Sequence, residues 1–248
     1  VIPTLLLKEH SLIKTVKFGK YQYIGDPANT VRIFNELEVD ELCFLDIRAT
    51  VEKREPNYKV LREIADECFM PLSFGGGLSS FDQVKKILTM GFEKVVINSH
   101  AFANPGFITK IAEHFGNQAV VASIDVKKNL FGKYLVYSHS GTYNTKHEPA
   151  EWASTLETLG AGEILLTSID REGTWEGYDI DLVKKVSEAV SIPVIANGGA
   201  GVISHLGAAV KQGGASALAV GSMVVFQAKG LGVLVNFPDK EELSKVIN

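Results

Sequence analysis

Several residues able to transfer protons stand directly after short apolar segments of the chain. Asp46 and Asp125 end two such segments, and Lys8 follows another. A carboxylate beside a lysine can transfer protons, and the lysine can hold an anionic intermediate. These residues therefore predict acid–base chemistry, provided that the fold brings the ends of the segments together. For Asp46 the alternative is a carboxylate that caps or salt-bridges a loop.

Two glycine-rich stretches repeat each other along the chain. "MPLSFGGGLSSF" and "IPVIANGGAGVISH" each run from a proline through a short apolar segment to clustered glycines, and Pro71 and Pro193 give an offset of 122 residues. Clustered glycines let backbone N–H groups approach an anion at a helix start, although each cluster is also compatible with a tight turn. Two such clusters predict a substrate with a phosphate at each end.

The elements that must position these residues follow the same repeat. Eight nearly continuously apolar segments alternate with segments of helical spacing, as expected for parallel strands that are buried on both faces. The predicted strands are Ile2–Leu7, Leu42–Asp46, Leu72–Phe74, Val95–Ile97, Val120–Ile124, Ile164–Ser168, Val194–Ala196 and Ala217–Val220. The pattern predicts a single (β/α)8 TIM barrel over residues 1–248, built from two homologous half-barrels of about 1–118 and 119–248. A doubly wound sheet is disfavoured, because no Gly-x-Gly-x-x-Gly turn follows the first strand.

Composition excludes several other classes. The chain has 248 residues, a net charge of −4 and no long apolar run, so we expect no membrane span and no nucleic-acid partner. Cys43 and Cys68 fit buried thiols of a cytoplasmic protein better than a disulfide framework. The six histidines are scattered, so no metal site is predicted, and no cofactor is expected.

Two further groups of residues are candidates for the ends of a barrel. The loop that begins with Ser168 could complete the second glycine cluster, and Lys14 could be part of a lid over the mouth, with a solvated loop lysine as the alternative. Glu41, Lys94 and Glu163 begin predicted strands, so they would lie at the opposite end. Charges there usually stabilise that face, but these three could instead ring a central pore.

Several stretches resemble one known family over nearly the whole chain. They are "GDPANTVRIFNELEVDELCFLDIRATVEKR", "FGGGLSSFDQV", "KVVINS", "FGNQAVVASIDVKK", "GAGEILLTSIDREGTWEGYD" and "ANGGAG". They are similar to the cyclase subunit of imidazole glycerol phosphate synthase. The resemblance implies a barrel that docks a glutaminase subunit on its N-terminal face and receives ammonia along its axis. At the other face, such a lyase splits and cyclises a bisphosphorylated aminoimidazole ribonucleotide.

The resemblance also implies roles for individual residues. Glu41, Lys94 and Glu163 resemble the ammonia gate, whose arginine would precede Val1. One phosphate site would be formed by Gly76, Gly77, Asn98 and Ser99. The other would be formed by Gly173, Gly198, Gly199, Ala219 and Gly221.

One departure from the family changes the interpretation. The family pairs an aspartate that ends strand one with an aspartate that ends strand five; Asp125 matches the second, but Leu6 stands at the first. A leucine cannot carry a proton, so the chain's own catalytic competence is in question. Asn197 and Glu172 also differ from the family's serine and aspartate, which suggests a different anion at the second cluster. These changes resemble a divergent branch associated with acetamidino modification of surface-polysaccharide sugars.

Three hypotheses follow from this pattern. In the first, the chain delivers ammonia from a glutaminase to a phosphorylated small molecule or sugar, with a sugar amidotransferase as a third partner. In the second, it is a true histidine-pathway cyclase in which Lys8 or Glu9 takes the missing role. In the third, it is a noncatalytic scaffold that activates the glutaminase.

Overall fold

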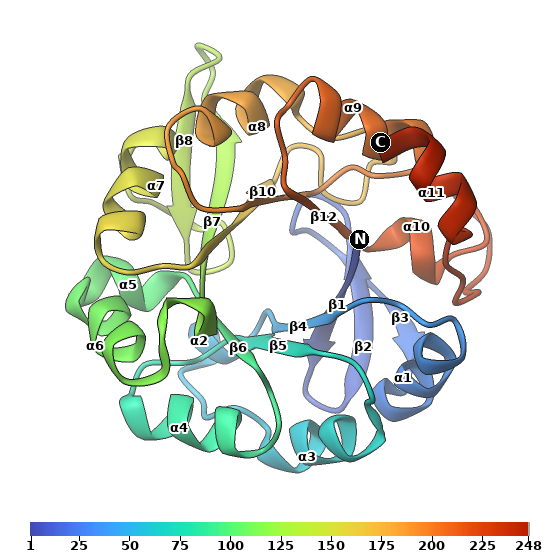
Figure 1. Ribbon diagram of the computed structural model, residues 1–248, viewed down its shortest axis with the longest axis horizontal. Helices are drawn as coiled ribbons and strands as arrows, with labels where there is room; N and C mark the ends of the chain where they lie inside the picture. Colours follow the sequence, from blue (N-terminus) through green and yellow to red (C-terminus); the bar gives the residue numbers. More distant parts are fainter. Residues whose placement is uncertain (248) are drawn as a thin grey trace.

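Eight parallel strands form a closed barrel in the computed structural model, which describes residues 1–247. The strands are β1 (Ile2–Lys8), β4 (Leu42–Asp46), β5 (Leu72–Gly75), β6 (Lys94–Ile97), β7 (Val120–Lys128), β10 (Glu163–Ser168), β11 (Val194–Asn197) and β12 (Ala217–Val220). Each pairs in parallel with the next, and β12 pairs with β1 to close the ring. Figure 1 shows the strands as an inner ring with helices outside. The predicted (β/α)8 barrel is confirmed.

The helices lie between the strands and cover their outer faces. They are α1 (Pro27–Glu36), α2 (Ala49–Glu52), α3 (Tyr58–Glu67), α4 (Phe81–Thr89), α5 (Ser99–Ala103), α6 (Gly106–Phe115), α7 (Pro149–Thr158), α8 (Ile180–Ser187), α9 (Ile203–Lys211), α10 (Ser222–Val225) and α11 (Lys240–Ile247), with a 3-10 turn at Asn117–Ala119. Polar side chains fix several starts: Asp26 caps α1, and Ser80 with Gln83 forms a capping box on α4. In α3, Val60, Leu61 and Ile64 give the helix one buried face.

Two apolar layers explain why the strands read as continuous hydrophobic runs. One layer fills the space between strands and helices. A smaller one fills the barrel interior with Ile2, Cys43, Val96, Val121, Leu165, Ile195 and Ala219. Because side chains alternate across a strand, each strand needs apolar residues on both faces.

Two hairpins extend the barrel at the end where the strands finish. After β1 the chain forms β2 (Ser11–Thr15) and β3 (Tyr21–Gly25), and after β7 it forms β8 (Tyr134–Ser138) and β9 (Tyr143–Asn144). The sequence analysis predicted no strand between the first and second barrel strands, so this hairpin, which carries Lys14 on β2, was missed. Pairing with β8 also carries β7 to Lys128, four residues beyond its predicted end.

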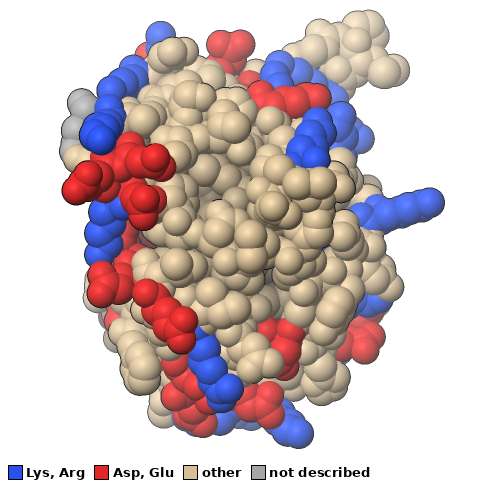
Figure 2. All heavy atoms as spheres, turned by 90° about the vertical axis from the view of Figure 1, so that its right-hand side faces the viewer, with Lys and Arg blue, Asp and Glu red and all other residues tan. Residues whose placement is uncertain are grey.

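The barrel has a charged outer surface and two free cysteines. Figure 2 shows one flank of the barrel, on which basic and acidic side chains are mixed. Cys43 and Cys68 are free thiols, Cys43 buried and Cys68 half-buried. Among residues 1–247, no helix is long and apolar enough to cross a membrane.

Candidate functional site

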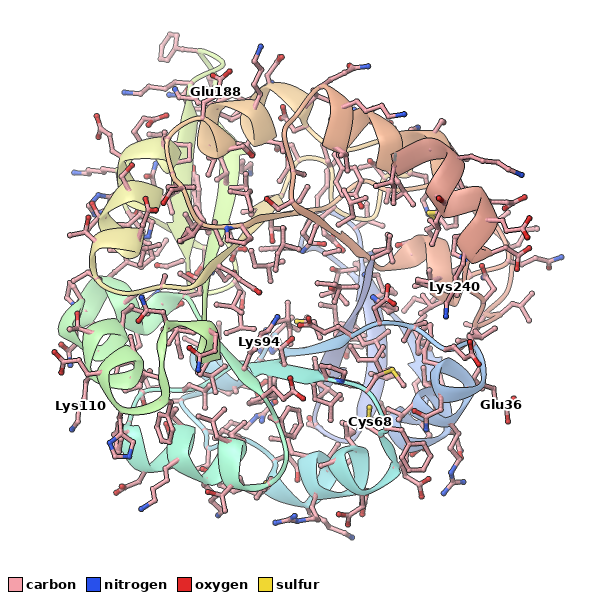
Figure 3. All side chains as sticks on the ribbon, viewed as in Figure 1. Glu36, Cys68, Lys94, Lys110, Glu188 and Lys240 are labelled. Atoms are coloured by element: carbon pink, nitrogen blue, oxygen red, sulfur yellow. The ribbon has the colours of Figure 1, made fainter. Side chains whose placement is uncertain are left out.

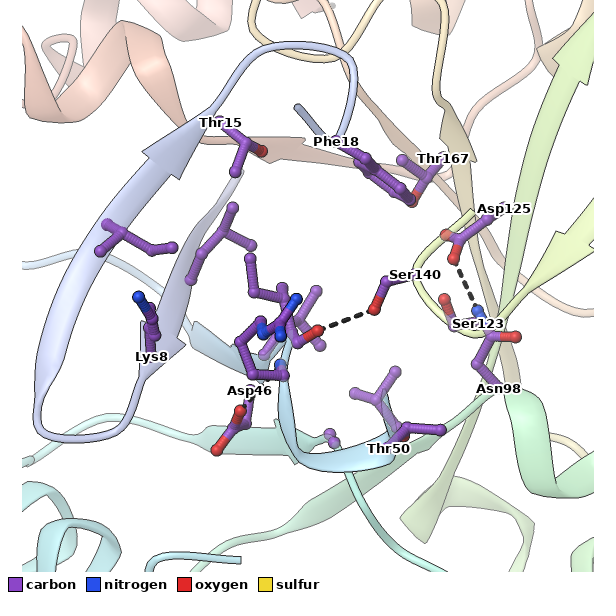
Figure 4. Close-up of a pocket in the computed structure, with 18 of the residues that line it drawn as sticks. Lys8, Thr15, Phe18, Asp46, Thr50, Asn98, Ser123, Asp125, Ser140 and Thr167 are labelled. Carbon is purple, nitrogen blue, oxygen red and sulfur yellow. Dashed lines mark hydrogen bonds between the residues drawn. The ribbon is translucent and has the colours of Figure 1, made fainter. Parts of the chain in front are cut away.

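The carboxyl ends of the strands surround a cavity of about 520 Å³. Residues from β1, β4, β5, β6, β7, β10 and β11 line it, and the β2–β3 hairpin forms one wall. Figure 4 shows Asp125, Asn98 and Thr167 on one side of this mouth and Lys8 on the other. The position agrees with the general location of active sites in such barrels.

Asp125 is a buried carboxyl group in the wall of the mouth. It is 8% exposed, and Asn98 Nδ2 donates to its Oδ2 at 2.8 Å. Burial raises the pKa of Asp125 to about 7; hydrogen bonds from Asn98 and Thr167 oppose the rise, and the negative charge of Glu172 adds to it. A carboxyl with this pKa can both give and accept a proton near neutral pH.

Of the β1 residues at the mouth, Lys8 was predicted to act with Asp125, whereas Leu6 stands where the family has an aspartate; Figure 4 shows Lys8 across the mouth from Asp125. Leu6 is 8% exposed and lines the mouth as an apolar side chain. Lys8 also lines the mouth, but its ammonium lies 3.8 Å from the centroid of the Tyr21 ring and donates to the Tyr21 hydroxyl. Tyr21 belongs to β3 of the hairpin that the sequence analysis missed, so this contact was not predicted.

Asp46 serves the loop that follows its strand. Its Oδ1 accepts hydrogen bonds from the backbone N–H groups of Arg48 and Ala49, each at 3.1 Å. Its Oδ2 lies 2.8 Å from Arg54 Nη1. These contacts match the alternative prediction for Asp46, in which its carboxylate caps and salt-bridges a loop. Arg54 was missed because it lies eight residues along the chain, after α2.

The first predicted phosphate site opens directly to the mouth. Gly76, Gly77, Asn98 and Ser99 all line the cavity. Gly76 and Gly77 have φ values of 122° and 71°, which glycine adopts without strain. A Cβ on Gly76 would stand 2.3 Å from the carbonyl oxygen of Asp46, so the two loops pack too closely for a side chain.

The second predicted site does not open to the mouth cavity. Gly173, Gly198, Gly199, Ala219 and Gly221 are not among the residues that line the mouth. Ala219 lies in the barrel interior, and its carbonyl accepts from the Tyr178 hydroxyl at 2.9 Å. Ser168 is buried beneath the same loop, and its carbonyl accepts from the N–H of Glu172 at 3.0 Å.

Lys14 and Glu172 lie beside that second site. Lys14 is 8% exposed, so the solvated-lysine alternative does not hold. Its ammonium lies 3.9 Å from Glu172 Oε1, and burial lowers the pKa of Lys14, with the charge of Glu172 partly offsetting the effect. The N–H of Phe18 donates to Glu172 Oε2 at 3.2 Å, which ties the hairpin to the loop after β10.

Three charged residues meet at the opposite end of the barrel. Lys94 Nζ lies 2.9 Å from Glu41 Oε2 and 2.9 Å from Glu163 Oε1. Burial works against the charge on Lys94, but the two carboxylates outweigh it and raise its pKa. Figure 3 shows Lys94 close to the barrel axis. The predicted juxtaposition of these residues is confirmed, while their role as a gate stays a prediction.

A small cavity of about 10 Å³ lies between this trio and the mouth. Its walls include Glu41, Cys43 and Ser73, and its volume is about that of one water molecule. Thr4 and Val96 border both this cavity and the mouth. The barrel interior therefore contains a small, mostly apolar space with a few polar groups between its two charged ends.

The fold and the site define the class of protein: a (β/α)8 barrel with a buried carboxyl group of raised pKa at the carboxyl ends of its strands. The family model described as "Histidine biosynthesis protein" matches residues 1–229. A Pseudomonas aeruginosa protein with the provisional name imidazole glycerol phosphate synthase subunit hisF2 is 48% identical over 243 residues, which cover 98% of this chain and 97% of the relative. The imidazole glycerol phosphate synthase subunit HisF of Chlorobaculum parvum is 42% identical, over 92% and 90% of the two chains. The chain belongs to the HisF-like cyclase family.

Proposed function

We propose that this chain is the ammonia-using subunit of a glutamine amidotransferase complex and that its acceptor is a sugar of surface-polysaccharide synthesis. A glutaminase partner would dock on the N-terminal face of the barrel, and ammonia would pass along the axis to the mouth. The observation that carries the proposal is the contrast between a complete charged trio at the N-terminal end and a mouth in which Leu6 faces the cavity.

The route for ammonia rests on the barrel interior. Glu41 belongs to both the trio and the wall of the small cavity. Above it, the walls combine apolar side chains with small polar groups such as Thr4 and Ser73, which suit a small neutral molecule. Since Thr4 and Val96 border both cavities, a modest movement of these two side chains would connect them.

The residues of the mouth support the proposal that the acceptor differs from that of a cyclase. Asp125 offers one proton-exchanging group near neutral pH, whereas the residue at the expected position of its partner is apolar. A general acid or base contributes about 10²–10⁴-fold in rate. A mouth that lacks one of two such groups is therefore poorly equipped for the cyclase reaction, although it can still deprotonate ammonium or protonate a leaving oxygen.

The names of the relatives favour a second candidate function, cyclisation in histidine biosynthesis. It is distinguished by turnover of the aminoimidazole ribonucleotide with ammonium salts alone. We expect the purified chain to show no more turnover than its Asp125→Asn variant. Turnover at the pace of an ordinary cyclase, lost in Asp125→Asn, would establish the histidine-pathway function instead.

A labelling experiment separates the proposal from a noncatalytic scaffold. The chain is copurified from its native cell with its companions, which mass spectrometry identifies, and the complex receives glutamine labelled with ¹⁵N in the side-chain amide. We expect the label in an amidated sugar. Label found only as free ammonium would indicate a scaffold that activates the glutaminase.

A further inference from the structure

The two predicted phosphate sites differ in whether a ligand can reach them. Gly76 and Gly77 line the open mouth together with Ser99. Of the glycines in the second site, Gly173 and Gly221 lie against the β2–β3 hairpin: a Cβ on Gly173 would stand 2.3 Å from the carbonyl oxygen of Thr15. The backbone N–H of Lys17 also donates to the carbonyl of Glu172 at 2.9 Å. The hairpin and the loop after β10 therefore pack against each other, and none of the glycines of the second site lines the mouth.

A charged pair occupies the space that remains there. The Lys14 ammonium lies directly against the backbone of Gly221, because a Cβ at that glycine would be 2.3 Å from Nζ. Glu172 holds this ammonium from the other side, and both side chains are less than a tenth exposed. A phosphate at the second site would meet a Lys14 ammonium whose charge Glu172 already balances, and the carboxylate of Glu172 would repel it.

Three oxygen atoms of mouth residues make no hydrogen bond, and one of them, Glu172 Oε1, meets only the Lys14 ammonium at 3.9 Å. Thr15 Oγ1, Asn98 Oδ1 and Glu172 Oε1 are buried, have no hydrogen-bond partner, and belong to residues that line the cavity. Buried polar atoms in proteins are nearly always hydrogen-bonded, so a group of orphan oxygens in one cavity indicates a ligand that supplies donors. Hydroxyl and ammonium groups supply donors; a phosphate dianion does not.

We infer that the mouth takes an acceptor with a single phosphate, bound beside Gly76, Gly77 and Ser99, whose hydroxyl or amine groups face Thr15, Asn98 and Glu172. The ligand class is an amino-sugar monophosphate rather than a bisphosphate. This inference rests on the proposed function, because it names the acceptor class for the same mouth.

Counting bound phosphate ions tests the closure of the second site. Isothermal titration calorimetry of the full chain with inorganic phosphate is expected to give one ion per chain. Ser99→Asp, which places a carboxylate at the open site, is expected to weaken binding at least tenfold. Two ions per chain in the unmodified protein, or none, would overturn the inference.

A pair of charge-removing variants tests the role of the buried pair. Glu172→Gln frees Lys14 from its carboxylate partner, and we expect a second phosphate ion to bind. The matched control is Glu176→Gln on the same loop, whose side chain is 59% exposed and pairs with Arg171; it is expected to keep one ion. One ion in the Glu172→Gln variant would reject the assignment of the closure to Lys14 and Glu172.

Competition against bound phosphate tests the ligand class. Glucosamine 6-phosphate is expected to displace phosphate at a concentration at least fivefold lower than fructose 1,6-bisphosphate. Tighter binding of the bisphosphate would overturn the inference. These measurements contain no glutamine, ammonia or partner, so their failure would leave the proposed ammonia delivery intact, and a failure of ammonia delivery would not alter the phosphate count.

Discussion

The two ends of the barrel differ in how their charged and polar groups are paired. At the N-terminal end, Lys94 is bonded to Glu41 and Glu163, so each charge has a partner within 2.9 Å. At the mouth, Asp125 is held in a buried position that raises its pKa to about 7, and Glu172 keeps one oxygen without a hydrogen bond. Paired charges hold a fixed arrangement, whereas unpaired groups are poised for a ligand. Variants at the two ends should therefore change different properties.

Replacement of Asp125 at the mouth should have the largest effect on the rate of ammonia transfer. Asp125→Asn keeps the shape of the side chain but cannot exchange a proton, so we expect transfer of ammonia to the acceptor to fall by about 10²–10⁴-fold. The measurement is product formation from ammonium salts, without glutaminase.

Asp46→Asn is the matched control, because Asp46 also ends a barrel strand, β4, but serves its own loop. It should lower the melting temperature through the lost contact with Arg54 and leave the rate per folded molecule much closer to that of the parent chain. A larger loss of rate from Asp46→Asn than from Asp125→Asn would reverse the assignment of the two carboxylates.

A variant at the N-terminal end should change how tightly glutamine hydrolysis is coupled to product formation, and leave the reaction with ammonium unchanged. Glu163→Ala removes one of the two carboxylates on Lys94, so we expect glutamine hydrolysis to become uncoupled from product formation while ammonium-driven activity persists. The measurement is the ratio of product formed to glutamine hydrolysed in the reconstituted complex. Glu188→Ala, on an exposed helix end, is the control. An unchanged ratio in Glu163→Ala would reject the gate assignment.

Much of the fold was readable from the sequence because burial on both strand faces leaves an unambiguous apolar run. Leu42–Asp46 and Ala217–Val220 were predicted with the bounds that the structure has. The hairpin from Ser11 to Gly25 was not, since its strands are short and β3 is largely exposed, which leaves little hydrophobic periodicity to detect.

The site was partly predictable for a related reason. The carboxyl ends of parallel strands meet at one edge, so Asp125, Asn98 and the first glycines were expected at the mouth. The closure of the second glycine cluster depends on how the unpredicted hairpin packs, and the buried pair of Lys14 with Glu172 joins residues 158 positions apart. A contact of this kind leaves no local signal in the sequence.

Restoring a carboxyl at the apolar position of the mouth should have a smaller effect. Leu6→Asp returns a second proton carrier opposite Asp125. We expect any cyclase activity to rise by about tenfold, which is less than the roughly 10²–10⁴-fold that a well-placed acid or base contributes. Leu6→Asn is the control, since it is similar in shape to Asp but does not ionise. Equal activity in both variants would mean that the mouth differs from a cyclase site in more than one residue.

The smallest expected effect is on stability, and it follows from the raised pKa of Asp125. The folded-state pKa of about 7 lies above that of an unfolded aspartate, so the unfolded chain releases its proton first as the pH rises. Stability from this group is complete below about pH 4 and is lost as the pH approaches 7. Asp125→Asn, which stays neutral, should therefore gain more than about 1 kcal/mol of unfolding free energy relative to the parent chain between pH 4 and pH 8. Urea unfolding at both pH values measures the difference. A constant difference would show that the mouth keeps Asp125 ionised, and the contrast between a fully paired end and an unpaired mouth would then not hold.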